Sequence, residues 1–343
     1  MKAGFRKLAV ILTLGTLLVS GIAGCGHSGD AEKKLHLKIT LAGNEQSPMY
    51  EGAQKFAKLL EEKSGGRITG TVYANSSLAS GNQQKAIEMI QKGTIDVGWV
   101  AMIAQSSISP KLSILAMPWI WDNHAQSDAA FTPGAPVFQW YEKALREGNF
   151  QILGFAENGN RQITNNKHPI RRPADFRDLK LRVLADPVLL DVYRKLGANV
   201  VDINFGELFT AMQQGTVDGQ ENPVATIMVP GRYYEIQKYL TIWGGPYEPL
   251  LVEMNAKRWD SLSEADKKLV QACADEAVAY ERKLSRDATE QGIQLFRDKG
   301  CEVAVLTQDE IAAIKKEVQA VLDQYMATYD TEIVRLIEEA KRQ

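Results

Sequence analysis

Histidine is scarce in this sequence of 343 residues. The four histidines, His27, His36, His124 and His168, show no metal-ligand spacing. The sequence also lacks a G-x-S-x-G nucleophile turn, an H-E-x-x-H motif and a phosphate-binding G-x-x-x-x-G-K loop. These absences argue against the common hydrolases, metalloproteases and nucleotide-binding enzymes. We therefore expect no enzyme, no catalytic residue, no metal and no cofactor; an exported hydrolase with an unmarked pair of carboxylates is the enzyme alternative.

Long apolar runs are also absent, except at the beginning of the chain. Lys2, Arg6 and Lys7 precede an apolar run from Leu8 to Gly24, which is typical of a secretory signal peptide over residues 1–24. Residues 22–25, Ile-Ala-Gly-Cys, resemble the lipobox of bacterial lipoproteins, which implies cleavage before Cys25 and lipid attachment to it. An uncleaved anchor or ordinary cleavage is the alternative. We expect an extracytoplasmic protein, in the periplasm or at the cell surface, with residues 25–34 as a flexible tether to the membrane.

An excess of positive charge is missing from the mature chain. Removal of residues 1–24 takes three of the 40 basic residues and leaves 37 against 42 acidic residues, a net charge of about −5. This sign argues against a nucleic-acid partner and against electrostatic binding to a membrane surface.

Cysteine is rare as well. After Cys25, only Cys273 and Cys301 remain. Cys273 lies on the apolar face of an expected helix, and Cys301 begins an expected strand. An exported protein could join them in a disulfide, but these positions favour two separate buried thiols.

The remaining 319 residues alternate between strand and helix patterns, which predicts an α/β fold. Their number is large for one core, so we expect two lobes with a ligand cleft between them. We place the first lobe at 35–158 plus about 248–287, and the second at 159–247 plus about 288–343. Two helical stretches, Ser263 to about Lys299 and Gln308 to Arg342, are expected to brace both lobes.

One short pattern occurs twice. Residues 89–96, MIQKGTID, and 211–218, AMQQGTVD, each describe a helix that ends at glycine and leads into Thr-(Ile/Val)-Asp. Chance similarity of two helix ends is one explanation. The alternative is two lobes of similar build, with corresponding turns facing one cleft.

Several stretches together resemble a known family. These are FAKLLEEKSGGRI, AIEMIQKGTIDVG, LAMPWIWDN, GNRQITNNKHPI, LKLRVLADP, LGANVVDINFGELFTAMQQGTVDGQENP and YYEIQKYLT. Their order and spacing resemble the extracytoplasmic solute-binding proteins of TRAP transporters, the DctP family, over nearly the whole mature chain. The resemblance implies a monomer with a two-lobed, periplasmic-binding-protein-like fold. It also implies a small organic acid ligand that is delivered to TRAP permease subunits in the membrane.

The resemblance implies four ligand-binding residues. Arg182 would pair with the solute carboxylate, since a guanidinium matches a carboxylate bidentately, and it would be hydrated in an open cleft. Arg161 would lie on or beside the same carboxylate, Asn222 would bind an oxygen, and Phe205 would cover the apolar face of the solute. Considered alone, these residues are also compatible with ordinary roles, and for Arg182 a surface position is then the better interpretation. Arg182 could lie on the surface, Arg161 could pair with Asp175 or Asp178, Asn222 could occupy a turn, and Phe205 could belong to the core.

Weaker candidates for solute contact are Gln46, Trp99, Trp243 and Tyr247. Ala101 stands where sialic-acid binders of the family have an acidic residue, so we do not expect sialate. Because Trp99 and Trp243 would suit stacking on a sugar ring, a sugar acid is slightly favoured over a C4-dicarboxylate. A chemosensory binding protein that serves a receptor is the alternative function.

Overall fold

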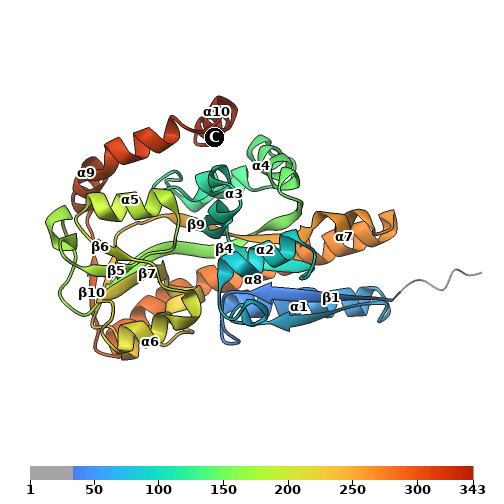
Figure 1. The fold of residues 1–343 in the computed structure, drawn as a ribbon, viewed down its shortest axis with the longest axis horizontal. Coiled ribbons are helices and arrows are strands. Elements are labelled where there is room, and N and C mark those ends of the chain that lie inside the picture. Colours follow the sequence, from blue (N-terminus) through green and yellow to red (C-terminus); the bar gives the residue numbers. More distant parts are fainter. Residues whose placement is uncertain (1–33, 343) are drawn as a thin grey trace, which may run out of the picture. The chain divides into compact units, whose positions relative to one another are not determined.

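The computed structural model describes residues 34–342 (Figure 1). The predicted signal peptide and the lipid-attachment residue Cys25 lie outside the described residues, as does all of the predicted tether except Lys34. None of the helices in the described part is long and apolar enough to cross a membrane.

The described residues contain ten strands in one hydrogen-bonded network, ordered β2-β1-β3-β9-β4-β7-β5-β6, with β8 joining β4 to β10. Their bounds are β1 Leu35–Leu41, β2 Ile68–Tyr73, β3 Val97–Ala101, β4 Phe150–Asn165, β5 Lys180–Arg182, β6 Asn199–Val201, β7 Gly219–Pro223, β8 Tyr239–Ile242, β9 Tyr247–Asn255 and β10 Glu302–Val305. Two groups, β2-β1-β3 and β7-β5-β6, are parallel and flank the antiparallel strands β9 and β4.

Strand β4 connects the two halves of this network. Its first part, residues 150–160, pairs with β9, and its last part, residues 161–165, pairs with β7. Two register shifts interrupt the first part, between Ile152 and Gly154 and between Glu157 and Gly159. A single continuous strand therefore carries the chain from one sheet into the other, and Arg161 is the first residue of its second part.

The helices lie around the strands, as the α/β alternation predicted (Figure 1). Their bounds are α1 Pro48–Lys63, α2 Gln83–Gln91, α3 His124–Ala130, α4 Pro136–Glu147, α5 Pro187–Lys195, α6 Leu208–Gln213, α7 Ala256–Asp260, α8 Glu264–Asp298, α9 Gln308–Met326 and α10 Thr331–Ala340. Helix α1 begins as expected: the Ser47 hydroxyl accepts from Tyr50 N at 3.2 Å, and Pro48 is the first helical residue.

The long late helices pack against the strands β4 and β10 and against other helices. Helix α8 contacts α1, β4 and β10, α9 contacts α5, and α10 contacts α3 and α4. The sequence predicted one helical stretch from Gln308 to Arg342, and this is wrong in detail. The helix ends at Met326, and α10 starts afresh after Asp330, whose carboxylate accepts from Glu332 N at 2.8 Å.

The repeated sequence pattern is a repeated structure. Gly93 and Gly215 both have positive φ, +77° and +71°, which glycine adopts without strain. The aspartate that follows each turn accepts from the backbone N–H of a lysine at 2.8 and 2.9 Å: Asp96 from Lys38, and Asp218 from Lys180. Both parallel groups of strands thus use the same turn. These turns precede β3 and β7, whereas Arg182 lies at the end of β5, so the expectation that the turns face the cleft is wrong.

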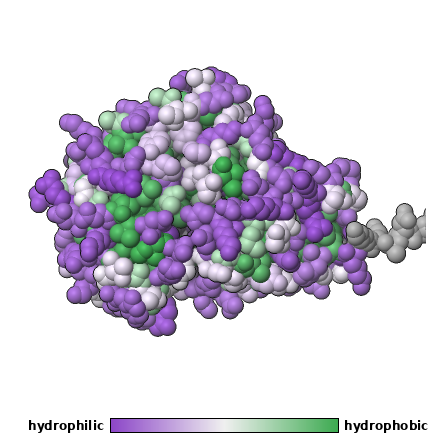
Figure 2. All heavy atoms as spheres, viewed as in Figure 1, coloured by the Kyte–Doolittle hydropathy of each residue, from purple (hydrophilic) through white to green (hydrophobic). Residues whose placement is uncertain are grey.

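The buried apolar residues form three clusters, and the two cysteines belong to different ones. Cys273 lies in the cluster under α1 and β1, and Cys301 lies in the cluster around α6. Both are free, buried thiols, as the sequence predicted. Among the described residues, only Tyr280 and Val305 are exposed large hydrophobic side chains, and the face in Figure 2 is mostly hydrophilic with small separate apolar areas.

One buried acid should make stability depend on pH. The Glu253 side chain on β9 is inaccessible to solvent; its Oε1 accepts from Gln105 Nε2 at 2.7 Å, and its Oε2 has no partner among the described residues. Burial raises the pKa of Glu253 to about 8. Burial likewise raises the pKa of Tyr141 well above its usual value, with a smaller contribution from the negative charge of Glu253. The folded protein thus keeps a proton that the unfolded chain releases near its ordinary pKa of 4.5.

We predict that the retained proton of Glu253 makes its full contribution to the free energy of unfolding below about pH 4.5. This contribution is lost as the pH rises to about 8. Glu253→Gln cannot ionise, so it should reduce the loss of unfolding free energy between about pH 5 and 8 by on the order of 4 kcal/mol. Urea unfolding at both pH values measures this difference, with Glu302→Gln, an exposed acid, as the control. Equal pH dependence of wild type and Glu253→Gln would contradict the prediction.

Candidate functional site

Arg182 is a buried cation without an anion. It is the last residue of β5, and its side chain is 3% exposed. Its Nε donates to the carbonyl oxygen of Ile203 at 3.1 Å. Its Nη1 has no hydrogen-bond partner, and no carboxylate of the described residues forms an ion pair with it. Burial lowers the pKa of Arg182 from its usual value, which reflects the cost of holding this charge away from water.

The described residues around Arg182 enclose a cavity of about 310 Å³, which we call cavity A. Its lining includes Asn82, the N-cap of α2, and the first two helical residues, Gln83 and Gln84. The free backbone N–H groups and the positive dipole end of a helix favour an anion. Arg182 and the beginning of α2 therefore present positive potential to the same space.

Phe205 separates cavity A from a second space, cavity B, of about 240 Å³. Phe205 lines both cavities, and cavity B also receives Asn44, Asn75 and Thr226. The lining thus combines three aromatic rings, those of Phe205, Phe209 and Tyr233, with amide and hydroxyl groups, a composition suited to a small solute that has both polar groups and a carbon skeleton.

A third and smaller space, cavity C, of about 10 Å³, lies beside Arg161 and Asn222. Gln83 and Leu184 line both cavity A and cavity C. The structure therefore brings Arg182, Arg161, Asn222 and Phe205 to one set of adjoining cavities. The sequence interpretation missed Gln83. The available signal was its position as first residue of a helix that follows a strand, since ligands approach parallel α/β units at the strand ends from which such helices begin.

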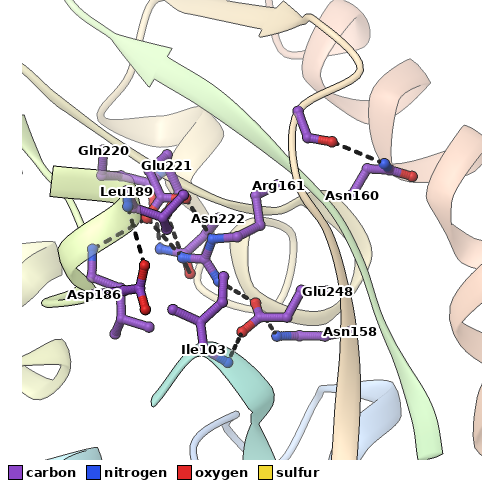
Figure 3. A network of polar contacts seen from close by, with 12 residues as sticks. Ile103, Asn158, Asn160, Arg161, Asp186, Leu189, Gln220, Glu221, Asn222 and Glu248 are labelled. Atoms are coloured by element: carbon purple, nitrogen blue, oxygen red, sulfur yellow. Dashed lines mark hydrogen bonds and ion pairs between the residues drawn. The ribbon is translucent and has the colours of Figure 1, made fainter. Parts of the chain in front are cut away.

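Arg161 is held by two glutamates (Figure 3). It is 2% exposed, and Glu221 of β7 accepts from its Nε and Nη2 in a bidentate pair. Glu248 of β9 accepts from its Nη1, and Asn222 Oδ1 accepts from its Nη2 at 3.1 Å. Burial lowers the pKa of Arg161, but the two glutamates outweigh burial and raise this pKa above its usual value. The alternative partners Asp175 and Asp178 do not pair with Arg161.

The two glutamates are themselves held by neighbouring backbone and amide groups. Glu248 accepts from Ile103 N at 3.1 Å and from Asn158 Nδ2 at 2.9 Å, and Glu221 accepts from Leu184 N at 3.2 Å. The amide of Asn222 also donates to Gln220. Arg161 thus reaches the cavities only through one Nη1 hydrogen that has no partner among the described residues.

The weaker candidates lie elsewhere. Trp99 and Trp243 are fully buried, and the Trp243 Nε1 donates to the carbonyl oxygen of Arg161 at 2.9 Å. Tyr247 is 5% exposed and donates to Glu157 at 3.1 Å, while Gln46 is exposed. None of these four residues lines cavities A, B or C. The stacking tryptophans that favoured a sugar ring therefore belong to the apolar interior.

Contacts between segments distant in sequence close over the cavities. Gly206 N donates to the carbonyl oxygen of Gly81 at 3.3 Å. Asn82 Nδ2 donates to Asn204 Oδ1 at 2.9 Å, and Asn44 Nδ2 donates to the carbonyl oxygen of Pro230 at 2.7 Å. These contacts explain why Arg182 is buried here; the expectation of a hydrated Arg182 applied to an open cleft. In residues 34–342, no cluster of three or more metal-binding side chains occurs.

The comparisons with known proteins show the family of this chain. Residues 40–328 match the family model DctP, described as bacterial extracellular solute-binding protein, family 7. The 2,3-diketo-L-gulonate-binding periplasmic protein YiaO of Escherichia coli is 28% identical over 84% of this chain and 85% of its own. An uncharacterized protein of Sinorhizobium fredii, y4mM, is 34% identical over 73% of this chain, which spans 45% of that longer protein.

The solved structures agree with the fold. The sugar acid binding protein DctPAm of Advenella mimigardefordensis, in complex with galactonate, superposes with a TM-score of 0.85 at 28% identity. The match covers 90% of this chain and 99% of that one. The two-lobed α/β fold and the family resemblance predicted from the sequence are thereby confirmed, and the proteins matched are binding proteins and not enzymes. This chain belongs to the DctP family of bacterial extracellular solute-binding proteins, the solute-binding components of TRAP transporters.

Proposed function

We propose that this protein captures a small organic acid anion in cavities A to C and delivers it to the membrane subunits of a TRAP transporter. The observation that carries the proposal is Arg182, a buried guanidinium whose Nη1 has no hydrogen-bond partner and which forms no ion pair with a carboxylate of the described residues. An uncompensated buried charge is costly. A solute carboxylate would supply the missing anion, and bidentate pairing would fix its orientation.

The rest of the site has complementary roles. The N-terminus of α2 adds backbone donors beside Arg182, and Gln83 offers an amide to both cavities that it lines. Asn222 offers a donor and an acceptor, and Phe205 provides a face for the carbon skeleton. Arg161 mainly positions Asn222 and Glu221; its one remaining Nη1 hydrogen, beside cavity C, could reach a solute oxygen.

A sugar acid is favoured over a C4-dicarboxylate. The support from the structure is the lining of amides and hydroxyls, which can bond to solute hydroxyls. The names of two similar proteins add support, since one binds galactonate and the other 2,3-diketo-L-gulonate. The preference no longer rests on tryptophan stacking, because Trp99 and Trp243 are in the interior.

The proposed cellular context is a protein held outside the cytoplasm by lipid on Cys25 and acting as a monomer. The alternative is a chemosensory protein that presents the same solute to a receptor. Genes for small and large TRAP membrane subunits beside the gene for this protein would favour transport, and a receptor kinase gene would favour sensing.

We predict that Arg182→Ala weakens solute binding more than any other single truncation in the site. Loss of a buried, charge-assisted pair costs roughly 2–5 kcal/mol, or roughly 30-fold to several thousand-fold in affinity. Arg182→Lys should lose a substantial part of the affinity, because an ammonium cannot reproduce the planar fork. Calorimetry with the acid that gives the largest thermal shift in a screen of galactonate, erythronate and succinate measures the effect.

Arg171→Ala is the matched control, because Arg171 is a surface arginine whose pair with Glu310 lies away from the cavities. Without solute, Arg182→Ala should be at least as stable as wild type, because it removes an unpaired buried charge. A folded Arg182→Ala protein that binds the acid within about threefold of wild type would remove Arg182 from the site.

We predict that Arg161, in contrast to Arg182, contributes more to the stability of the solute-free protein than to solute binding. Arg161→Ala leaves Glu221 and Glu248 buried without their cation, a change that costs about 3–5 kcal/mol of stability in comparable buried pairs. The thermal midpoint of the solute-free protein should therefore fall, and Arg161→Met with Glu221→Gln and Glu248→Gln should recover part of it. If Arg161→Ala abolished binding at unchanged stability, Arg161 would act by direct contact and not by positioning.

We predict that Cys25→Ser prevents lipid attachment, because no other cysteine follows a lipobox-like sequence. Mass spectrometry of the protein purified from membranes should show the lipid mass on wild type only. A protein that begins near Glu32 should still fold and bind the acid, which separates anchoring from binding. Lipid on the Cys25→Ser protein would disprove this anchor.

A further inference from the structure

The three cavities contain few charges. Among the described residues that line cavities A, B and C, only Arg182, Asp202 and Arg161 are charged. Arg161 is already held by Glu221 and Glu248, so this buried group of three carries no net positive charge. Arg182 is therefore the one cation of the lining that lacks a protein carboxylate partner, and it can compensate one negative charge.

Asp202 adds a negative charge to the same space. It follows β6, lines cavity A together with Arg182, and is exposed. Its carboxylate makes no ion pair and no hydrogen bond with any described residue, Arg182 included. Cavity A thus has Arg182 and the beginning of α2 as its positive part and the free carboxylate of Asp202 as its negative part.

This arrangement distinguishes acids by their second functional group. A solute with one carboxylate on Arg182 and hydroxyls along its chain can donate to Asp202. A solute with a second carboxylate would bring a like charge to Asp202, and like-charge contacts in binding sites are strongly unfavourable. The described lining residues contain no second unpaired cation that could bind this second carboxylate.

We propose that Asp202 makes the cleft selective for hydroxylated monocarboxylates over the corresponding dicarboxylates. This inference rests on the proposed function of the same site, since it takes Arg182 as the partner of the first carboxylate. Asp202 acts by repelling the second carboxylate and by accepting from a hydroxyl, so its removal changes the preference among acids more than the overall affinity.

The test compares acids that differ only at one end. Galactonate and galactarate share a six-carbon skeleton, and the terminal hydroxymethyl group of the first is a carboxylate in the second. Erythronate and meso-tartrate form the corresponding four-carbon pair. Calorimetry with wild type, Asp202→Asn and Arg182→Ala gives the affinity ratio of monocarboxylate to dicarboxylate within each pair. Asp309→Asn is the charge-matched control, because Asp309 is exposed and lines none of the three cavities.

In wild type and Asp309→Asn, we expect the monocarboxylate of a pair to bind more tightly. Asp202→Asn should lower the ratio by about tenfold, mainly through tighter binding of the dicarboxylate. Because Asp202 is exposed, added salt should reduce the wild-type preference but should have less effect on Asp202→Asn. A merely structural role of Asp202 would not produce this salt dependence.

The outcomes separate the two proposals. If the acids bind and depend on Arg182, but the ratio in Asp202→Asn stays within about threefold of wild type, the inference about Asp202 is overturned and the proposed function stands. If wild type and Arg182→Ala respond alike to all four acids, the proposed function itself fails. A lower ratio in Asp202→Asn, with no change in Asp309→Asn, supports the inference.

Discussion

The pairing of Arg161 with Glu221 and Glu248 is the interaction on which the site depends. The three residues come from β4, β7 and β9, so this buried cluster joins the two halves of the strand network at the point where β4 passes between them. Each glutamate also accepts backbone N–H groups, from Leu184 and from Ile103. A buried ion pair of this kind contributes little net stability but imposes a strict geometry, because any misplaced partner leaves a buried charge uncompensated. The position of Arg161 beside cavity C is therefore fixed by the protein itself.

Arg182 is as deeply buried as Arg161 but differs from it in its ion pairs. Both guanidiniums are at least 97% buried, yet one has two carboxylates and the other has none. The contacts that bury Arg182, among them Gly81 with Gly206 and Asn82 with Asn204, join segments far apart in sequence. Closing these contacts without an anion confines an unpaired charge, whereas closing them over a carboxylate satisfies it. In the proposed function, a solute carboxylate on Arg182 would shift the population toward the closed form by its differential interaction with Arg182.

The sequence predicted the parts of this molecule that depend on local patterns. The Ser47 cap, the strand–helix alternation and the paired Gly-Thr-x-Asp turns are all encoded within short stretches. The partners of Arg161 were not predictable, because Glu221 and Glu248 lie 60 and 87 residues away and nothing local distinguishes them from other glutamates. The prediction that Trp99 and Trp243 stack on a sugar ring was wrong for a related reason. A large aromatic ring suits a sugar and an apolar core equally well, and only the tertiary structure distinguishes the two.

The irregular part of β4 lies directly before the residues of the ion cluster. Its two register shifts lie between Ile152 and Gly159, just before Arg161, and such a shift locally bends a strand and interrupts its ladder. The backbone N–H of Glu157, at the second shift, donates to Glu281 of α8 at 2.8 Å, so this buried acid stabilises the irregular backbone. Burial also raises the pKa of Glu281 well above its usual value. The irregular part of β4 is thus supported from α8, while the part that carries Arg161 is held by β7 and β9. The bend in β4 therefore lies directly before Arg161, and the ion cluster begins where the regular pairing with β7 begins.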